Sequence, residues 1–197
     1  MMKRKTCPIC QRPLSVCICH KIKEIDNLWP IWILQDSTEK KHAIGTAKIA
    51  NLSLSQCNTF TAEYAQCNET LTSSIESLVP VLVYPGDDVL TLDELAVEAT
   101  RPLLFLDGTW RKTKKMFYEI PILKDMPRLS INPDSISRYR IRKTPNDSAI
   151  STLEAIVYVL SKLENDTEKY QPMLEAMDWM IEKQIEYMGE ATFRKNY

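Results

Sequence analysis

The pattern of apolar and polar positions along the chain predicts strands and helices that alternate. Three short apolar stretches have the length and composition of strands buried on both faces of a sheet; they are residues 29–34, 80–84 and 102–106. Weaker strand patterns cover residues 59–64, 128–131 and 139–142. Each stretch is too short to be a buried helix, and the segments between them carry helical patterns.

Helical periodicity and start signals occupy the intervening segments. They predict helices over 43–54, 71–78, 151–163 and 170–188, and a basic helix from Trp110 to about residue 118. Two capping boxes mark helix starts, one at Thr91 with Glu94 and one at Ser151 with Glu154. Continuous apolar strands separated by helices predict an α/β fold, with a mostly parallel sheet covered by helices on both faces.

Length and composition limit the class of protein. The chain has 197 residues, of which 44% are hydrophobic and 26% charged, which suits one compact domain with a small appendage. The longest apolar run, residues 28–34, is far shorter than the ~20 residues that span a bilayer. The N-terminus carries charge but lacks the apolar region of a secretory signal. We therefore expect a soluble cytoplasmic protein with no membrane partner, and we favour a monomer, although the sequence does not fix the oligomeric state.

Four of the six cysteines lie within thirteen residues, as Cys7, Cys10, Cys17 and Cys19. Because disulfides are disfavoured in a reducing compartment, a cluster as tight as this is better explained as a metal site. Four thiolates complete the tetrahedral shell of a structural Zn²⁺; redox pairs or free thiols are the alternative. The sequence thus predicts a zinc knuckle over residues 1–23 and an α/β domain with a C-terminal helix over 24–197. Cys57 and Cys67 lie elsewhere and are expected to be buried or half-buried.

The net charge of −1 hides a strong sorting of charge along the chain. Successive segments 1–23, 24–107, 108–143 and 144–197 carry net charges of +6, −9, +7 and −5. Two basic segments separated by acidic ones are typical of a protein with one cationic face, which would bind a polyanion in a salt-dependent way. Scattered, solvated lysines are the alternative explanation.

Candidate chemistry lies where two of the apolar strands end, because ligands of open α/β sheets bind beyond the carboxyl ends of the strands. One end carries residues 84–86 and the other Asp107, Gly108 and Trp110. Asp107 could serve as a general base or hold a cationic group, or it could simply cap a helix. Trp110 could stack on a base or belong to the core. Glycine-rich nucleotide loops and a Ser/Cys–His triad are both missing from the sequence.

Five motifs occur in the order and spacing seen in the DTW-domain proteins, which this chain resembles from Cys7 to about Leu163. They are Cys7-x2-Cys10-x-Arg12-Pro13-x3-Cys17-x-Cys19, Tyr84-Pro85, Asp107-Gly-Thr-Trp110-Arg111, Tyr139-Arg-x-Arg142-Lys143 and Ser151-Thr-Leu-Glu-Ala155. Glu39 and Thr46 also match the family pattern. One departure is Asp36-Ser37, where the family has His-Pro before the glutamate.

The resemblance implies a tRNA-uridine aminocarboxypropyltransferase with a SPOUT-like knotted topology. Such an enzyme transfers the 3-amino-3-carboxypropyl group of S-adenosylmethionine to N3 of a uridine and releases methylthioadenosine. The resemblance makes Asp107 the catalytic candidate. It implies cofactor contacts at Thr46, Leu82, Tyr84, Pro85, Gly86, Asp107, Gly108, Thr109, Trp110, Ser151, Thr152 and Glu154.

The predicted contacts with tRNA come from the second basic segment together with the knuckle. They are Arg111, Lys112, Lys114, Lys115, Arg138, Arg140, Arg142 and Lys143. Three other functions fit parts of the same pattern: an RNA methyltransferase that uses S-adenosylmethionine, a non-catalytic RNA-binding zinc protein, and an aminocarboxypropyltransferase that acts on ribosomal RNA.

Overall fold

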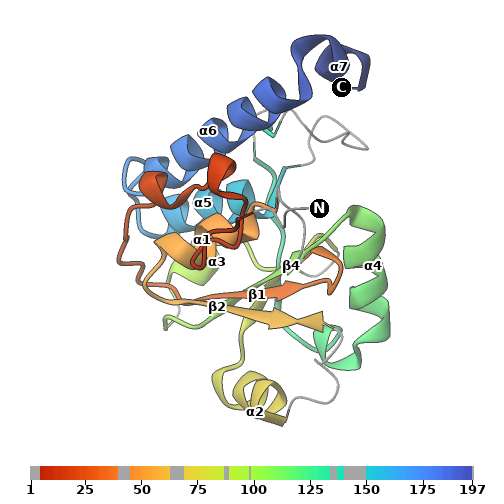
Figure 1. The fold of residues 1–197 in the computed structure, drawn as a ribbon. Helices are drawn as coiled ribbons and strands as arrows, with labels where there is room; N and C mark the ends of the chain where they lie inside the picture. The colour runs from red at the N-terminus through yellow and green to blue at the C-terminus, as the bar shows by residue number, and fades with distance from the viewer. Residues whose placement is uncertain are drawn as a thin grey trace.

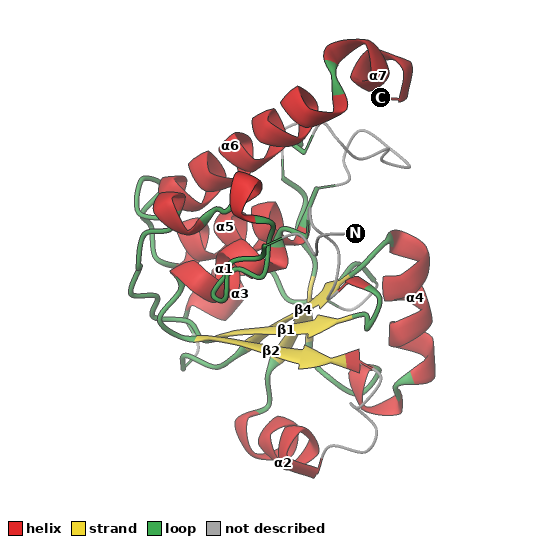
Figure 2. Ribbon diagram, in the orientation of Figure 1, coloured by secondary structure: helices red, strands yellow, loops and turns green. Residues whose placement is uncertain are grey.

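A single five-stranded sheet organises the chain. The computed structural model describes residues 5–39, 45–62, 69–86, 89–97, 99–133, 137–139 and 150–196. The strands are β1 (Ile31–Gln35), β2 (Cys57–Thr61), β3 (Val81–Val83), β4 (Leu103–Asp107) and β5 (Arg128–Leu129). They lie in the order β2-β1-β4-β3-β5, and all neighbouring pairs are parallel, which confirms the predicted parallel α/β sheet (Figures 1 and 2).

Seven α-helices lie within the described residues. They are α1 (Ala47–Ser53), α2 (Glu69–Leu78), α3 (Leu92–Ala96), α4 (Trp110–Glu119), α5 (Thr152–Leu163), α6 (Gln171–Met188) and α7 (Glu190–Asn196). Short 3-10 turns lie at η1 (Leu14–Val16), η2 (Cys19–Lys21) and η5 (Pro121–Leu123). Both predicted capping boxes are confirmed: the Thr91 hydroxyl accepts from the backbone N–H of Glu94, and the Ser151 hydroxyl accepts from that of Glu154.

The alternation of side chains along the strands divides the core into two layers. Ile31 and Ile33 face one core, which holds side chains of α1, α3, α5 and α6. Trp32 and Leu34 face the other core, which holds side chains of α2 and α4. Because both faces of the central strands are buried, their sequences are continuously apolar rather than alternating. Helices therefore cover both faces, as predicted, and Figure 1 shows α4 and α2 on the opposite side of the sheet from α1, α5 and α6.

Several predicted boundaries were wrong. Strand β2 begins at Cys57, two residues before the predicted start. Helix α1 begins at Ala47 rather than near residue 43, which lies outside the described part of the chain. Tyr139 was expected in a strand but belongs to none, and its side chain is buried in the core. Residues 140–142 of the same predicted strand lie outside the described residues. Cys57 is half-buried, as expected, and Cys67 lies outside the described part.

The N-terminal segment packs on the helical layer. Ile18 is completely buried, and Cys7 and Cys10 belong to the same core as Met177 of α6. Figure 1 shows this segment against α1 and α6, on the face away from α4. None of the helices in the described ranges is long and apolar enough to cross a membrane.

Candidate functional site

The candidate site lies at the carboxyl ends of β1 and β4, two neighbouring strands whose following helices pack on opposite faces of the sheet. Strand β1 leads to α1 on one face of the sheet, and its neighbour β4 leads to α4 on the other face. Parallel α/β sheets bind ligands in the crevice that forms at such a switch point, beyond the carboxyl ends of the strands. Gln35 and Asp107 are register partners as the last residues of these two strands.

The Asp107 side chain is only 7% exposed, and two hydrogen bonds hold its carboxylate at this point. The Gln35 side-chain amide donates to Asp107 Oδ2 at 2.8 Å, and the Thr152 hydroxyl donates to Oδ1 at 2.7 Å. The helix cap of α4 is Thr109, whose hydroxyl accepts from the Lys112 backbone N–H at 3.4 Å. Asp107 is therefore not the helix cap, which removes the structural alternative considered for it.

The first turn of α5 supplies the second wall of the site. Ser151 caps the helix, and Thr152 at its first position bonds to Asp107. The N-terminus of a twelve-residue helix carries partial positive charge, which stabilises a neighbouring anion. The N-terminus of α5 therefore lies directly beside Asp107.

The segment after β1 forms a polar network with α4. The Lys112 ammonium donates to Glu39 Oε1 at 2.6 Å and to the Thr38 hydroxyl at 2.6 Å, and it lies 3.6 Å from Asp36 Oδ1. Burial opposes the ionisation of Asp36, but hydrogen bonds from Thr38 and the charge of Lys112 prevail and lower the pKa of Asp36. The hydrogen bond to Glu39 raises the pKa of Lys112. Lys112, predicted to contact RNA, is thus engaged within the protein.

Gly108 allows this network to close beside Asp107. A Cβ at position 108 would lie 3.2 Å from Cβ of Lys112 and 3.6 Å from Cβ of Asp36. The backbone N–H of Asp36 also donates to the carbonyl of Asp107 at 3.0 Å. The residue pair Asp36-Ser37, where the chain departs from the family pattern, therefore lies against the candidate catalytic residue.

The second strand end, at residues 84–86, packs toward α4. The Tyr84 ring stacks on Phe117 with centroids 4.7 Å apart, and burial raises the pKa of Tyr84. The Arg128 guanidinium covers Gly86, where an added Cβ would collide with it, and lies 5.8 Å from the Phe117 ring centroid. Leu82 is fully buried within β3, and Pro85 is exposed.

Glu154 binds the segment that precedes the undescribed residues 140–149. Its Oε1 accepts from the Arg138 backbone N–H at 2.6 Å, and its Oε2 accepts from the Ser137 hydroxyl at 2.8 Å and from the Ser151 N–H at 2.7 Å. The Arg138 guanidinium pairs with Asp178 of α6 at 3.2 Å. Glu154, predicted to bind the cofactor, thus positions backbone close to the site.

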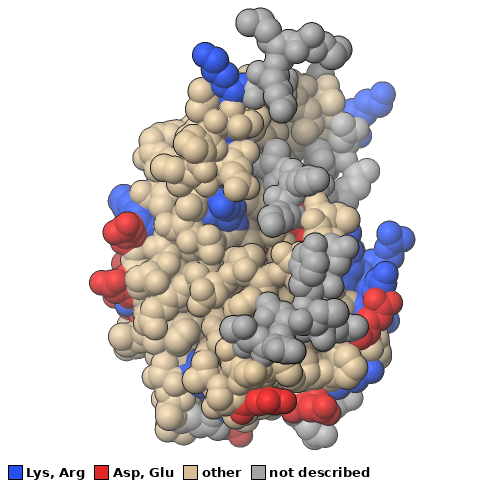
Figure 3. All heavy atoms as spheres, turned by 60° about the horizontal axis from the view of Figure 1, so that its bottom comes forward, with Lys and Arg blue, Asp and Glu red and all other residues tan. Residues whose placement is uncertain are grey.

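The remaining predicted residues are spread more widely. Thr46 is 5% exposed just before α1, and Trp110 is 45% exposed at the start of α4. The solvent side of α4 carries three of the predicted RNA contacts, Arg111, Lys114 and Lys115, of which Lys115 pairs with Glu119 at 3.8 Å. Figure 3 shows Lys and Arg side chains at the right edge of the face it presents, with acidic side chains beside them. Arg140, Arg142 and Lys143 lie outside the described residues.

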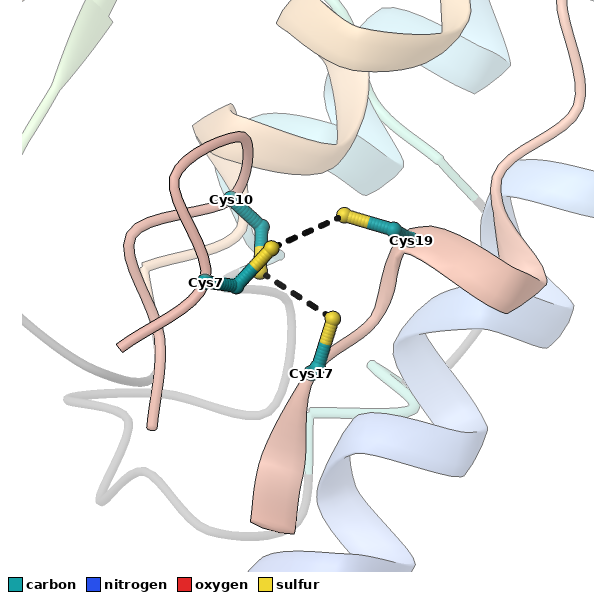
Figure 4. Close-up of side chains that lie close together, drawn as sticks. All are labelled: Cys7, Cys10, Cys17 and Cys19. Atoms are coloured by element: carbon teal, nitrogen blue, oxygen red, sulfur yellow. Dashed lines mark hydrogen bonds between the residues drawn. The ribbon is translucent and has the colours of Figure 1, made fainter. Parts of the chain in front are cut away.

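The four N-terminal cysteines converge as their spacing predicted (Figure 4). All four sulfur atoms lie within 4.8 Å of one another, and the pairs Cys7–Cys19 and Cys10–Cys17 are each 3.7 Å apart. Four Zn–S bonds of about 2.3 Å in a tetrahedron place the sulfurs about 3.8 Å apart. Two of the pairs already have this separation, so a tetrahedral metal ion fits with small shifts of the side chains.

The electrostatics of the cluster also suit a metal. Hydrogen bonds from the backbone amides of Cys10 and Ile9 lower the pKa of Cys7 to about 6, so this thiolate forms readily. Burial raises the pKa of Cys19 to about 12. A bound cation removes that penalty, because metal ligation requires the deprotonated thiol and releases its proton. The cluster can hold a metal with no position left open for catalysis.

Two residues of this region were not among the predicted site residues. Gln35 is a polar residue that ends a four-residue apolar stretch, and it bonds to Asp107. Arg12 lies between cysteine ligands and is 4% exposed. Gln35 is a polar group that ends an apolar strand, and Arg12 is a charged group that the packing of the N-terminal segment buries. Such positions are informative because burying a polar group is costly.

Fold and site together define a parallel α/β protein with a buried carboxylate, Asp107, at its strand switch point and a four-cysteine cluster that can hold a metal ion. The chain belongs to the DTW domain family, whose model matches residues 4–185. It is 27% identical to tRNA-uridine aminocarboxypropyltransferase 2 of Drosophila melanogaster over 93% of this chain and 76% of the relative. The Mus musculus protein of the same name is 22% identical over 99% of this chain and 68% of the relative.

A plant relative extends the comparison. tRNA-uridine aminocarboxypropyltransferase A of Arabidopsis thaliana is 22% identical over 94% of this chain and 83% of the relative. The comparison with solved structures gave no significant match.

Proposed function

We propose that this protein is a tRNA-uridine aminocarboxypropyltransferase that uses S-adenosylmethionine as donor. The observation that carries the proposal is the Asp107 carboxylate, held by Gln35 and Thr152 at the strand switch point of a DTW-family chain. The relatives named for this activity cover most of the chain and support the same reaction class.

The site complements the end of the donor that is transferred. An aminocarboxypropyl group carries an ammonium and a carboxylate on one carbon. The Asp107 carboxylate suits the ammonium, and the N-terminus of α5 suits the carboxylate. These two features adjoin each other, since Thr152 belongs to that helix turn and bonds to Asp107. The buried Thr46 and the half-exposed Trp110 are further candidates for donor contacts.

The reaction needs little more than positioning and one proton acceptor. The N3 lone pair of uridine attacks the carbon attached to the sulfonium, the carbon–sulfur bond breaks, and its electron pair goes to sulfur, which leaves as neutral methylthioadenosine. The N3 proton must be taken up, and the Asp107 carboxylate is the candidate acceptor, as an alternative to its role as partner of the donor's ammonium. The sulfonium is already an activated leaving group, so correct alignment of the two substrates supplies most of the remaining acceleration.

The RNA side of the proposal rests on exposed charge. Arg111, Lys114 and Lys115 lie on the solvent side of α4, whose first residue follows Asp107 by only three positions. They are suited to phosphate contacts near the target uridine. The proposal also includes a structural zinc held by the four cysteines. It further includes a cytoplasmic, monomeric protein with the SPOUT-like knot of the family.

The direct test supplies the purified protein with unmodified tRNA and S-adenosylmethionine labelled in one position at a time. Label in the carboxyl carbon is expected to enter tRNA, with release of an equal amount of methylthioadenosine. Label in the methyl group is expected to stay out. Transfer of the methyl label alone would instead identify a methyltransferase, and binding of tRNA with no transfer of either label would identify a non-catalytic RNA-binding protein.

Asp107→Asn and Lys48→Met form a matched pair for the same assay. Asp107→Asn keeps the shape of the side chain but removes its charge, and is expected to lower the rate at least a hundredfold. Lys48→Met removes a charge from α1 at a position that is not a predicted donor or tRNA contact, and is expected to leave the rate within about twofold of wild type. Equal rates for Asp107→Asn and wild type would exclude Asp107 as the proton acceptor.

A further inference from the structure

Arg12 is a buried cation whose hydrogen-bonding capacity is only partly used. Its side chain is 4% exposed, and Nη2 donates to the carbonyl oxygen of Gly45 at 3.0 Å. The other amino group, Nη1, is fully buried and has no hydrogen-bond partner among the described residues. Arginine is rarely buried without a counter-charge, because it stays protonated under all ordinary conditions. The buried charge of Arg12 therefore calls for a compensating negative charge close by.

The metal module fixes where the guanidinium lies. The Arg12 carbonyl accepts from the Cys7 backbone N–H at 2.8 Å, and the Gln11 N–H donates to the Cys7 carbonyl at 2.9 Å. Gln11 adopts a positive φ of 61°, which turns the chain sharply just before Arg12. The knuckle that presents Cys7 and Cys10 thus also sets the direction of Arg12.

The surroundings of the guanidinium are the cluster on one side and the start of α1 on the other. Burial lowers the pKa of Arg12, and negative charge on Cys10, Tyr139 or Cys17 would raise it. A divalent ion bound by four thiolates would leave two net negative charges on the cluster. A buried guanidinium beside that cluster is the counter-charge that burial of these negative charges requires.

The acceptor on the other side adjoins the candidate donor site. Gly45 directly precedes Thr46, whose carbonyl accepts from the Ile49 N–H at 2.9 Å in the first turn of α1. Thr46 is buried and is a predicted donor contact. A shift of the guanidinium would thus move the turn that holds Thr46.

We propose that Arg12 is a positioning residue that couples metal occupancy of the four-cysteine cluster to the order of the Gly45–Thr46 turn. The guanidinium balances the charge of the metal–thiolate cluster and bonds to Gly45 at the same time. Loss of the metal removes the anionic partner, so the buried cation loses its compensation and the turn loosens. Only the last readout below, binding of S-adenosylmethionine, rests on the proposed function.

The test combines removal of the metal with removal of the guanidinium. The zinc-loaded protein, Arg12→Met and Arg12→Lys are challenged with a chelator, and zinc release is followed with a colorimetric indicator. Amide hydrogen exchange is measured over residues 46–53 before and after release. Lys21→Met is the control, because Lys21 is an exposed cation two residues from Cys19.

Arg12→Met is expected to release zinc at least tenfold faster than wild type. Wild type is expected to exchange the 46–53 amides at least tenfold faster after zinc is removed. In zinc-loaded Arg12→Met the 46–53 amides are expected to exchange faster than in zinc-loaded wild type. Removal of zinc from this variant should accelerate their exchange by less than a further twofold. Arg12→Lys keeps the charge but not the planar fork, so it should retain zinc better than Arg12→Met while still exchanging faster than wild type.

Three results would overturn the proposal. The first is unchanged zinc release and exchange in Arg12→Met, and the second is equal effects of metal removal in Arg12→Met and wild type. The third applies even if Arg12→Met fails to fold: zinc-free wild type that exchanges its 46–53 amides as slowly as the zinc-loaded protein. Weaker binding of S-adenosylmethionine in Arg12→Lys, measured by calorimetry, would extend the coupling to the donor site. Failure of wild type to bind that donor would count against the proposed function but leave the zinc and exchange results interpretable.

Discussion

Replacing Gln35 with Glu places a second carboxyl group against the candidate catalytic residue. The amide nitrogen of Gln35 lies 2.8 Å from Asp107 Oδ2, so the new carboxyl oxygen would occupy nearly the same distance. Two unit charges at that separation repel by about 6 kcal/mol at an effective dielectric constant of about 20. That energy corresponds to an upper bound of about 4 pKa units, since one unit equals about 1.4 kcal/mol.

The variant pair is therefore expected to share one proton through much of the acid and neutral range. Proton acceptance from uridine then requires the pair to lose that proton first. In an assay of aminocarboxypropyl transfer against pH, the acid limb of kcat/KM should move upward by about two pH units or more. Binding of tRNA, measured without the donor, should change little.

Gln35→Met is the matched control, because it keeps the length of the side chain without a charge. Loss of one hydrogen bond to a charged group should cost about 1.5–3 kcal/mol of stability, seen in denaturant unfolding, while the acid limb stays in place. A Gln35→Glu enzyme with the pH profile and rate of wild type would show that the carboxylate at position 107 takes no part in proton transfer.

Three further predictions concern the surroundings of the site. Cys7→Ser and Cys19→Ser should each release the bound zinc and loosen the N-terminal segment while circular dichroism shows the α/β core still folded; stoichiometric zinc in both variants would refute the four-cysteine site. Lys112→Met should lower stability by about 0.5–1 kcal/mol at neutral pH. The folded-state pKa of Asp36 lies below 3.8 and that of Lys112 lies above 10.5. The loss of stability caused by Lys112→Met should therefore shrink as the pH falls below about 4 or rises above about 10.5. A loss of stability that stays constant across this range would contradict the ion pair. Glu154→Gln should speed amide exchange at residues 137–139, because three donors lose a charged acceptor, and unchanged exchange would show that this carboxylate does not hold the segment.

Local patterns in the sequence predict the elements and one end of the site. The continuous apolar stretches of β3 and β4 predict buried parallel strands because both of their faces are covered. The position of Asp107 at a strand end follows from the same pattern. Helix α7 was not predicted, because it follows a turn at Gly189 and carries no strong apolar face.

The contacts of the site depend on strand order, which local patterns do not contain. Gln35 meets Asp107 only because β1 and β4, separated by two other strands in sequence, lie side by side in register. Lys112 reads as a solvated cation in a basic segment, yet it bonds to Glu39 across the switch point. Arg12 looks like an exposed charge between ligands, and only the packing of the module on the helical layer buries it.

The central claim is that this chain aminocarboxypropylates a tRNA uridine. Mass spectrometry of nucleosides from total tRNA tests it most directly, in cells that have the gene, cells that lack it, and cells complemented with wild type or Asp107→Asn. The aminocarboxypropyl-uridine peak is expected to disappear without the gene, to return with wild type and to stay absent with Asp107→Asn. A peak of equal size in all four samples would contradict it.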